Sequence, residues 1–326
     1  MMKEKSILLG GFYGCGNLGD DAILKALIRA FSEISPHIRV SYLSGGDKAL
    51  ERSLAERGAT AVPRRSPAVT RAVRECDALV LGGGSLLQNE TGNPSLYAYL
   101  SLLNFARLHG KRTAILAGGL GPIDGGIPRA VTASALRRLD YASFRDETAC
   151  ELARLLGAPS PSVSGDLALL LREELCAIPL PPRFLLVSLR KKSGASVRVS
   201  ACRILHLSEE KKLTPVLCTL FPKEDGAYTA AVAREVSRLY GASGKSTASW
   251  MLPRLSAEKL RSVVSRASFV LSGRYHLALF AYSSGVPFSV IGDDPKLLAV
   301  KAERRPREEV TRLVREDVER FIRTAF

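Results

Sequence analysis

The chain has 326 residues, of which 46% are hydrophobic and 24% are charged, a composition typical of a soluble, folded protein. This length favours two domains over one. Lys and Arg outnumber Asp and Glu by 47 to 32, so the formal net charge is +15. The excess suits anionic partners, such as phosphorylated small molecules, nucleic acid or an anionic membrane surface, but a solvated basic surface explains it equally well.

Cysteines and apolar runs exclude several protein classes. The six cysteines lie far apart and form neither C-x-x-C nor a Cys/His cluster with zinc spacing, so we expect reduced cysteines and no metal site. The first apolar stretch runs into glycine too early for a signal peptide and is typical of a first strand. Because no window reaches about 18 apolar residues, we expect no membrane span. The interpretation is a cytoplasmic protein, at most peripheral at the inner face of the membrane.

The first half of the chain alternates apolar strands with helices. Strands are predicted at residues 6–12, 39–44, 59–63, 77–84, 112–122 and 141–146, and the segment 161–171 closes the set. Helices are predicted at residues 20–32, 49–58, 94–109, 130–139 and 146–157. Continuous apolar strands that alternate with helices indicate a parallel sheet covered on both faces.

A proline-containing linker, residues 172–183, precedes a second set of alternating elements. Strands are predicted at residues 184–190, 214–221, 268–274 and 287–292, and helices at residues 196–211, 227–241, 254–267, 276–285 and 306–326. The sequence therefore predicts two Rossmann-like parallel α/β domains, residues 1–175 and 183–326. The last helix is a candidate to pack on the first domain. Ligands of such sheets bind beyond the carboxyl ends of the strands, so we expect the site in a cleft between the domains.

A glycine loop, "GCGNLGDD" at residues 14–21, follows the first predicted strand and fits the dinucleotide fingerprint G-x-G-x-x-G. That function needs an acidic residue about 20 positions on, at the end of the second strand, but Arg39 stands there and Asp47 comes too late. Asp20 and Asp21 begin the next helix, where their carboxylates would satisfy the free N–H groups and repel a phosphate. The loop is therefore either a tight turn with an acidic helix cap or a contact to a polyhydroxylated ligand.

Two more glycine clusters end predicted strands in the same half. They are "LGGGS", with Gly82, Gly83 and Gly84, and "AGGLGP", with Gly118, Gly119 and Gly121. Three glycine-rich strand ends in one domain place bare backbone along one rim. Such a rim suits a ligand that must approach the main chain closely.

Four segments in this order and spacing resemble the polysaccharide pyruvyl transferase family. They are "GFYGCGNLGDDAIL", "LVLGGGSLLQ", "FRDETACELARLLG" and "VLSGRYHLALFAYSSGVPFSVIGDDPK". The pattern is similar to the bacterial enzymes that pyruvylate secondary cell-wall polysaccharides anchoring S-layer proteins. The resemblance implies a GT-B architecture, in which two Rossmann-like domains face a cleft. It also implies transfer of enolpyruvate from phosphoenolpyruvate (PEP) to a sugar, usually N-acetylmannosamine, as a 4,6-ketal. PEP is the donor substrate, and no cofactor is expected.

The resemblance also implies roles for His276, Arg145 and Lys296. His276 is the acid/base candidate, because imidazole suits proton transfer near neutral pH and the residue opens a predicted helix. Arg145 is implied as a catalytic and PEP-binding arginine, since its fork suits carboxylate or phosphate, and Lys296 as a phosphate ligand. Arg274 and Arg190, each at a strand end, are weaker phosphate candidates. The alternatives are a structural histidine, a local Arg145 ion pair and a solvated lysine.

The acceptor sugar is expected at the first domain. Candidate contacts are the polar and glycine residues of its rim: Asn17, Asp20, Asp21, Gly83 and Gly84. The expected partners are PEP and a lipid-linked saccharide, with peripheral membrane association and no nucleic acid. Two departures from the family pattern, "AGGLGP" for "GQGIGP" and a missing aromatic before "DPK", leave sugar specificity open. The runner-up function is a nucleotide-sugar glycosyltransferase of the same architecture, but "RYHLALFAYSSGVP" lacks the acidic residue that a ribose pocket needs.

Overall fold

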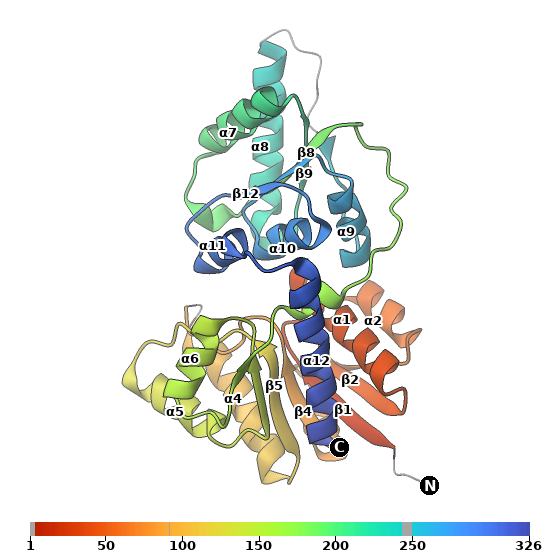
Figure 1. The fold of residues 1–326 in the computed structure, drawn as a ribbon, viewed down its shortest axis with the longest axis vertical. Helices are drawn as coiled ribbons and strands as arrows, with labels where there is room; N and C mark the ends of the chain where they lie inside the picture. The colour runs from red at the N-terminus through yellow and green to blue at the C-terminus, as the bar shows by residue number, and fades with distance from the viewer. Residues whose placement is uncertain (1–3, 91, 243–249) are drawn as a thin grey trace. The chain divides into compact units, whose positions relative to one another are not determined.

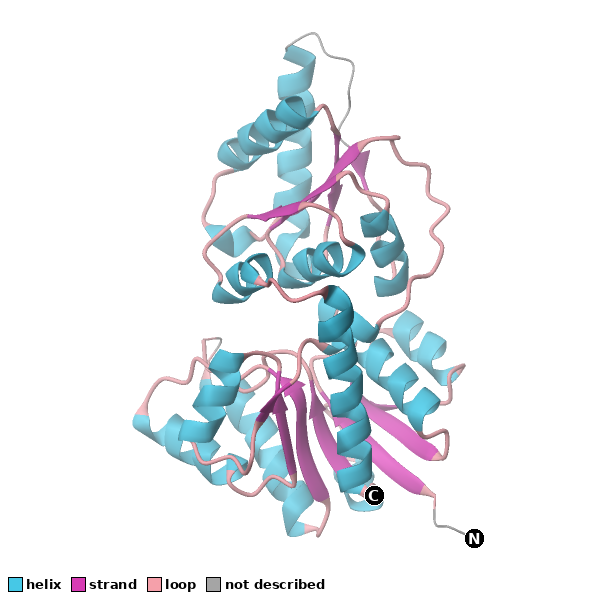
Figure 2. Cartoon of the chain, in the orientation of Figure 1, coloured by secondary structure: helices cyan, strands magenta, loops and turns pink. Residues whose placement is uncertain are grey.

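The protein is described by a computed structural model that covers residues 4–90, 92–242 and 250–326. The chain divides into two compact units. Unit 1 comprises residues 1–15, 20–171 and 308–326, and unit 2 comprises residues 16–19 and 172–307. Each unit is a layered α/β structure with one parallel sheet (Figure 1, Figure 2).

Unit 1 contains a seven-stranded parallel sheet in the order β3-β2-β1-β4-β5-β6-β7. Its strands are β1 (Lys5–Gly10), β2 (Ile38–Ser44), β3 (Thr60–Pro63), β4 (Ala78–Gly82), β5 (Arg112–Gly118), β6 (Tyr141–Phe144) and β7 (Ser162–Val163). Its helices are α1 (Leu18–Ile34), α2 (Lys48–Ala55), α3 (Ala68–Glu75), α4 (Asn93–Leu108), α5 (Gly126–Leu136), α6 (Glu147–Leu155), the short 3₁₀ helix η1 (Leu167–Leu170) and α12 (Arg307–Ala325). Helix α3 was not predicted, and α1 begins two residues earlier than predicted.

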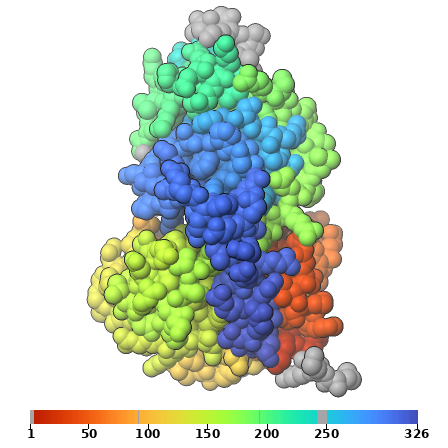
Figure 3. Space-filling model, viewed as in Figure 1, coloured from red at the N-terminus to blue at the C-terminus, as the bar shows by residue number. Residues whose placement is uncertain are grey.

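Burial explains why unit 1 folds as predicted. Ile7–Leu9 of β1 and all of β4 form continuous apolar runs whose side chains are almost fully buried, as both faces of a covered parallel sheet require. Side chains of α3, α4 and α5 pack on one face. Helices α1 and α12 lie together on the other, where Phe31 and Phe321 place their ring centroids 6.1 Å apart. In Figure 3 the α12 residues form a surface strip of unit 1.

Unit 2 contains a five-stranded parallel sheet in the order β10-β9-β8-β11-β12. Its strands are β8 (Phe184–Ser188), β9 (Thr214–Cys218), β10 (Trp250–Met251), β11 (Phe269–Ser272) and β12 (Phe288–Val290). Its helices are η2 (Lys191–Ser193), α7 (Val197–Lys211), α8 (Pro222–Ala242), α9 (Ala257–Ser265), α10 (Tyr275–Ser284) and α11 (Pro295–Ala302). Helices α7 and α8 pack on one face of the sheet, and α10 packs beside α9 and α11. The short edge strand β10 was not predicted.

The segment between the two sheets is a linker, as its prolines predicted. Residues 171–183, all of which the structure describes, contain no helix or strand. All six cysteines lie in the described residues and none forms a disulfide; four are buried, Cys15 is half-buried and Cys202 is exposed. Among the described residues, none of the helices combines the length and the apolar character that crossing a membrane requires.

Candidate active site

Each parallel sheet has a switch point, where the strand order reverses direction. It lies between β1 and β4 in unit 1, and between β8 and β11 in unit 2. Ligands of open α/β sheets bind at this position, beyond the carboxyl ends of the strands. The glycine loop and Gly82–Gly84 follow β1 and β4, whereas Arg190 and Arg274 follow β8 and β11. These predicted residues therefore fall at the two switch points, whereas Arg145 follows β6 and Lys296 follows β12.

The glycine loop is held by its own polar side chains. Gly14 and Gly16 adopt left-handed conformations, with φ of 66° and 88°. Asn17 Oδ1 accepts a hydrogen bond from Gly19 N at 3.2 Å, and Asp21 Oδ1 accepts one from Gly14 N at 2.7 Å. The expectation that Asp20 and Asp21 cap the helix is therefore corrected, because Asn17 lies at that position and α1 begins immediately after it. Asp21 occupies a loop N–H that a dinucleotide phosphate would need.

The end of the glycine loop belongs to unit 2 and lies against His276. Leu18 N donates a hydrogen bond to Leu220 O at 2.9 Å, which attaches the loop to the segment after β9. A Cβ atom on Gly19 would overlap the His276 imidazole ring. The third glycine of the motif is therefore required by the histidine that it contacts, and no phosphate is needed to explain it.

The rim of unit 1 brings together the glycine clusters and the first turn of α1. Gly83 and Gly84 both adopt left-handed backbone, with φ of 62° and 66°. A Cβ on Gly83 would lie 2.6 Å from Ile23 Cγ2, and one on Gly84 would lie 2.9 Å from Asp20 Oδ1. Only glycine fits at these two positions, so bare backbone borders the Asp20 carboxyl.

Charged groups are buried behind this rim. Arg145, after β6, has an almost fully buried side chain whose Nη1 lies 3.6 Å from Asp166 Oδ2 and whose Nε lies 3.4 Å from Asp146 Oδ2. Burial, followed by the charges of Asp21 and Asp166, raises the pKa of Asp20 to about 8, although Arg145 and Arg64 oppose the shift. Asp166 was not predicted, and its only signal in the sequence is its position just after Gly165, near the end of β7.

The carboxyl edge of the unit 2 sheet gathers cations around two carboxylates. Arg190 Nη1 donates to Asp294 Oδ2 at 2.6 Å, and Asp294 Oδ1 accepts from Lys296 N at 3.0 Å. Asp294 therefore joins the loop after β8 to the start of α11. Arg190 and Asp294 are both half-buried, so this pair borders solvent and stays accessible to an anion.

Arg274 is held by a second carboxylate pair. Its Nε donates to Asp225 Oδ2 at 2.6 Å and its Nη2 to Glu224 Oε2 at 2.9 Å. The buried Asp225 also accepts from Lys191 N at 3.0 Å. Because both ends of the Arg274 guanidinium already serve carboxylates, Arg274 is better placed to fix these loops than to hold a phosphate alone.

His276 lies in the first turn of α10, half-buried between aromatic neighbours. Its ring centroid is 5.1 Å from that of Tyr275, edge-on, and 6.5 Å from that of Phe280. Arg274, at the N-cap position of α10, makes no side-chain capping hydrogen bond. Unit 2 thus brings His276, Arg274, Arg190 and Lys296 to one sheet edge, whereas Arg145 lies in unit 1 with the acidic rim.

The terminal helix α12 is linked to the rim of unit 1 through a buried carboxylate. Asp317 accepts hydrogen bonds from Tyr141 Oη and Ser143 Oγ, each at 2.6 Å. Ser143 Oγ in turn accepts from Ala117 N at 2.8 Å. Ala117 has a left-handed φ of 50°, rare outside glycine, and directly precedes the pair Gly118–Gly119. Asp317 therefore supports the backbone of a glycine cluster from a helix far away in the sequence.

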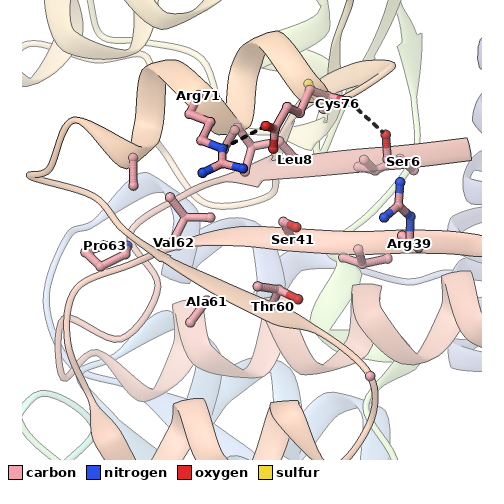
Figure 4. A pocket seen from close by; sticks show the side chains of 16 residues that line it. Ser6, Leu8, Arg39, Ser41, Thr60, Ala61, Val62, Pro63, Arg71 and Cys76 are labelled. Carbon is pink, nitrogen blue, oxygen red and sulfur yellow. Dashed lines mark hydrogen bonds and ion pairs between the residues drawn. The ribbon is translucent and has the colours of Figure 1, made fainter.

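A pocket of about 330 Å³ lies elsewhere in unit 1 (Figure 4). Its lining comes mainly from the first halves of β1 and β2, from β3 and from α3, and includes Ser6, Arg39, Thr60 and Arg71. It contains no predicted site residue. In the described parts of the chain, no group of three or more His, Cys, Asp or Glu side chains is arranged to hold a metal ion.

Comparison with known proteins decides the family. The family model of polysaccharide pyruvyl transferases matches residues 17–295, most of the chain. The chain belongs to the polysaccharide pyruvyl transferase family. This assignment makes it a transferase, and the match spans both glycine clusters, Arg145 and the strand ends of unit 2. No curated protein sequence matches it.

Solved structures show the fold of this family member. UDP-GlcNAc 2-epimerase from Methanocaldococcus jannaschii has a TM-score of 0.63 at 14% identity, over 98% of both chains. The Neisseria meningitidis enzyme, bound to UDP-GlcNAc, has a TM-score of 0.63 at 12% identity, over 98% of this chain and 99% of that one. Anabaena Alr3699/HepE, in complex with UDP and glucose, has a TM-score of 0.55 at 12% identity, over 97% and 94%. The predicted fold class, GT-B-like with two parallel α/β sheets, is confirmed.

Proposed function

We propose that this pyruvyl transferase moves enolpyruvate from PEP to a sugar of a lipid-linked cell-wall polysaccharide precursor, forming a 4,6-pyruvate ketal and releasing phosphate. The observation that carries the proposal is the set of cations at the carboxyl edge of the unit 2 sheet, in a chain of this family. PEP bears a phosphate and a carboxylate, and Arg190 after β8 and Lys296 after β12 supply cationic groups at this edge.

His276 is the proposed acid. It gives a proton to the methylene carbon of PEP, which becomes a methyl group and leaves C2 electrophilic. A first sugar hydroxyl adds to C2, and the C2–O bond to phosphate then breaks, with the electron pair leaving on phosphate. A second hydroxyl closes the ring. Of the two hydroxyl protons released, one restores the acid and the other leaves with phosphate, so atoms and charge balance.

Cationic side chains and the N-terminus of α10 are proposed to stabilise the negative charge of PEP and of the departing phosphate. The N–H groups in the first turn of α10 favour an anion at that end of the helix. Arg190 and Lys296 would clamp the departing phosphate, and Arg274 would keep the loops in place through Asp225. Arg145 is proposed to contact PEP while its guanidinium remains shared with Asp166, because the fork has five N–H donors.

The acceptor is proposed to bind at the glycine rim of unit 1, with Asn17, Asp20 and Asp21 as its polar contacts beside Gly83 and Gly84. Expected acceptors end in N-acetylmannosamine. The net charge of +15 would hold the enzyme at the anionic inner face of the membrane, where lipid-linked acceptors are found. Sedimentation with liposomes that did not depend on anionic lipid content would contradict this attachment.

The direct test incubates the enzyme with PEP and a lipid-linked disaccharide ending in N-acetylmannosamine. We expect phosphate release that requires both substrates, and a product whose mass corresponds to a pyruvate ketal. Absence of phosphate release, together with binding of a nucleotide sugar, would overturn the proposal in favour of a glycosyltransferase.

A further inference from the structure

Asp20 is a buried carboxyl group without a neighbouring donor. It lies in the first turn of α1, at the switch point between β1 and β4, with 9% of its surface exposed. Within the described residues, no hydrogen bond or ion pair is made to its carboxyl, in contrast to Asp21, which accepts from Gly14 N. Its oxygens are not among the fully inaccessible unpaired atoms, so the carboxyl is open to a hydrogen bond from a ligand at the rim.

The space beside the carboxyl is kept free of side chains. A Cβ on Gly84 would lie 2.9 Å from Asp20 Oδ1, so a side chain there would cover the carboxyl. A Cβ on the neighbouring rim residue Gly119 would lie 2.8 Å from Ser85 Oγ, another polar group of the same rim. Gly84 leaves the carboxyl bordered by main chain, and Gly119 lies close to the Gly84 carbonyl, at the end of the sheet where ligands of such sheets bind.

Charged side chains from several elements surround the Asp20 carboxyl. Negative charge comes from Asp21 on α1 and from Asp166 before η1, and positive charge from Arg145 after β6 and Arg64 after β3. The phenols of Tyr13, after β1, and Tyr99, on α4, also face it. Burial outweighs the two arginines and raises the pKa of Asp20 to about 8, far above that of an ordinary carboxyl group.

We propose that Asp20 is the base that takes the proton of the attacking acceptor hydroxyl. This inference rests on the proposed function. As the hydroxyl oxygen bonds to C2 of the enolpyruvyl group, its O–H bond breaks and the proton passes to a carboxylate oxygen of Asp20. The carboxyl then returns the proton to the departing phosphate, which closes the cycle without any other reactant. A base titrating near the working pH accepts a proton better than an ordinary carboxylate does.

The ionised carboxylate of Asp20 should lower the free energy of unfolding, because burial disfavours its charge. This effect separates a catalytic role from a structural one. Because its pKa is higher in the folded than in the unfolded protein, the folded state binds more protons between about pH 4 and pH 8. Its contribution to stability is therefore present at low pH and is lost as pH rises toward the folded pKa. An amide in its place has no charge to desolvate, so Asp20→Asn should raise the Tm at pH 8 and above.

The experiment compares wild type, Asp20→Asn and the control Asp140→Asn. Asp140 Oδ2 accepts from Thr113 N at the amino ends of β5 and β6, away from the strand ends that carry the site. With PEP and the N-acetylmannosamine-terminated disaccharide, Asp20→Asn is expected to lower kcat/KM for the acceptor on the order of 10²–10⁴-fold. It should also abolish a limb of the pH profile that rises toward pH 8, while its Tm at pH 8 exceeds that of wild type. Asp140→Asn should keep the activity and the limb.

Three results would overturn the inference. Acceptor kinetics in Asp20→Asn equal to wild type would exclude a proton-accepting role. A lower Tm in Asp20→Asn, with activity lost only in proportion to unfolded protein, would assign Asp20 a structural role. Absence of phosphate release by wild type would reject the proposed function itself, and the inference with it. This outcome is recognisable, because only then are Asp20→Asn and wild type equally inactive.

Discussion

The carboxyl edges of the two sheets share one backbone plan and differ in their charged side chains. In unit 1, the strand ends present bare glycine backbone and the buried acids Asp20, Asp21 and Asp166, with Arg145 as a buried counter-charge. In unit 2, the equivalent strand ends present an imidazole and half-buried cations, of which Arg190 and Arg274 are paired with Asp294 and Asp225. The plan of the sheet thus determines where a ligand binds, and the side chains determine its chemistry. Acids and bare backbone suit hydroxyl groups, whereas cations and a helix N-terminus suit anions.

The largest effect is expected at His276, the proposed acid of the donor side. His276→Ala should lower the rate of phosphate release on the order of 10²–10⁴-fold, because it removes proton transfer to the methylene carbon. His206→Ala on α7, where the histidine is exposed, is the matched control and should keep the rate. Near wild-type turnover in His276→Ala would remove this residue from the mechanism.

Gly19→Ala tests the contact between the glycine loop and the imidazole. The added Cβ would overlap the His276 ring, so the ring must move. A displacement of about 1 Å at a reacting group costs on the order of 10² in rate, and we expect a loss of that size.

The control for Gly19→Ala is Gly126→Ala, in the first turn of α5. A Cβ there meets no atom within 4 Å, so rate and stability should be preserved. Equal rates for Gly19→Ala and wild type would show that the position of His276 in this contact is not needed for turnover.

Removal of one donor-side cation should weaken PEP use more mildly. Arg190→Ala and Lys296→Ala should each raise KM for PEP about ten-fold, equivalent to ~1.4 kcal/mol of binding, because one charge on the anion goes unpaired. Lys301→Ala, on the exposed side of α11, is a same-charge control and should leave KM unchanged. Unchanged KM in both site variants would reject a cationic donor site.

Asp317→Ala should have the smallest effect on activity but a clear effect on stability. Tyr141 and Ser143 would lose the acceptor for their buried hydroxyl groups, which should lower the free energy of unfolding by about 1–3 kcal/mol. Glu316→Ala, on the exposed face of α12, should change it little. Denaturant unfolding that was identical for Asp317→Ala and wild type would show that this carboxylate does not anchor α12.

The sequence pattern predicted the elements whose own residues determine them, such as buried parallel strands. The apolar run ending in "GGG" corresponds to β4, because a buried parallel strand needs a continuous apolar stretch. Helix α3 was missed since it is short and lies between two strand-like segments, and β10 has only two residues. The start of α1 was predicted at Asp20 because two acids stand there, whereas Asn17 caps the helix by accepting from Gly19 N.

The partners of the site residues were not predictable from local pattern. Asp294 is 104 residues from Arg190, Asp225 is 49 from Arg274, and Asp317 is 174 from Ser143. Asp225 and Asp317 lie on helices in ordinary polar sequence. Asp294 lies in the segment "GDDPK", but nothing in one sequence marks it as the partner of Arg190. The residues at strand ends were predictable, because parallel sheets bring those ends to one edge.

Donor and acceptor are proposed to bind to different units, and PEP affinity is the sharpest test of this proposal. Calorimetric titration would compare wild type, the Arg190→Ala/Lys296→Ala double variant and Asp20→Asn. If unit 2 binds the donor and the unit 1 rim serves the acceptor, the double variant loses PEP binding and Asp20→Asn keeps the wild-type Kd. Loss of PEP binding in Asp20→Asn, with normal binding in the double variant, would contradict the account.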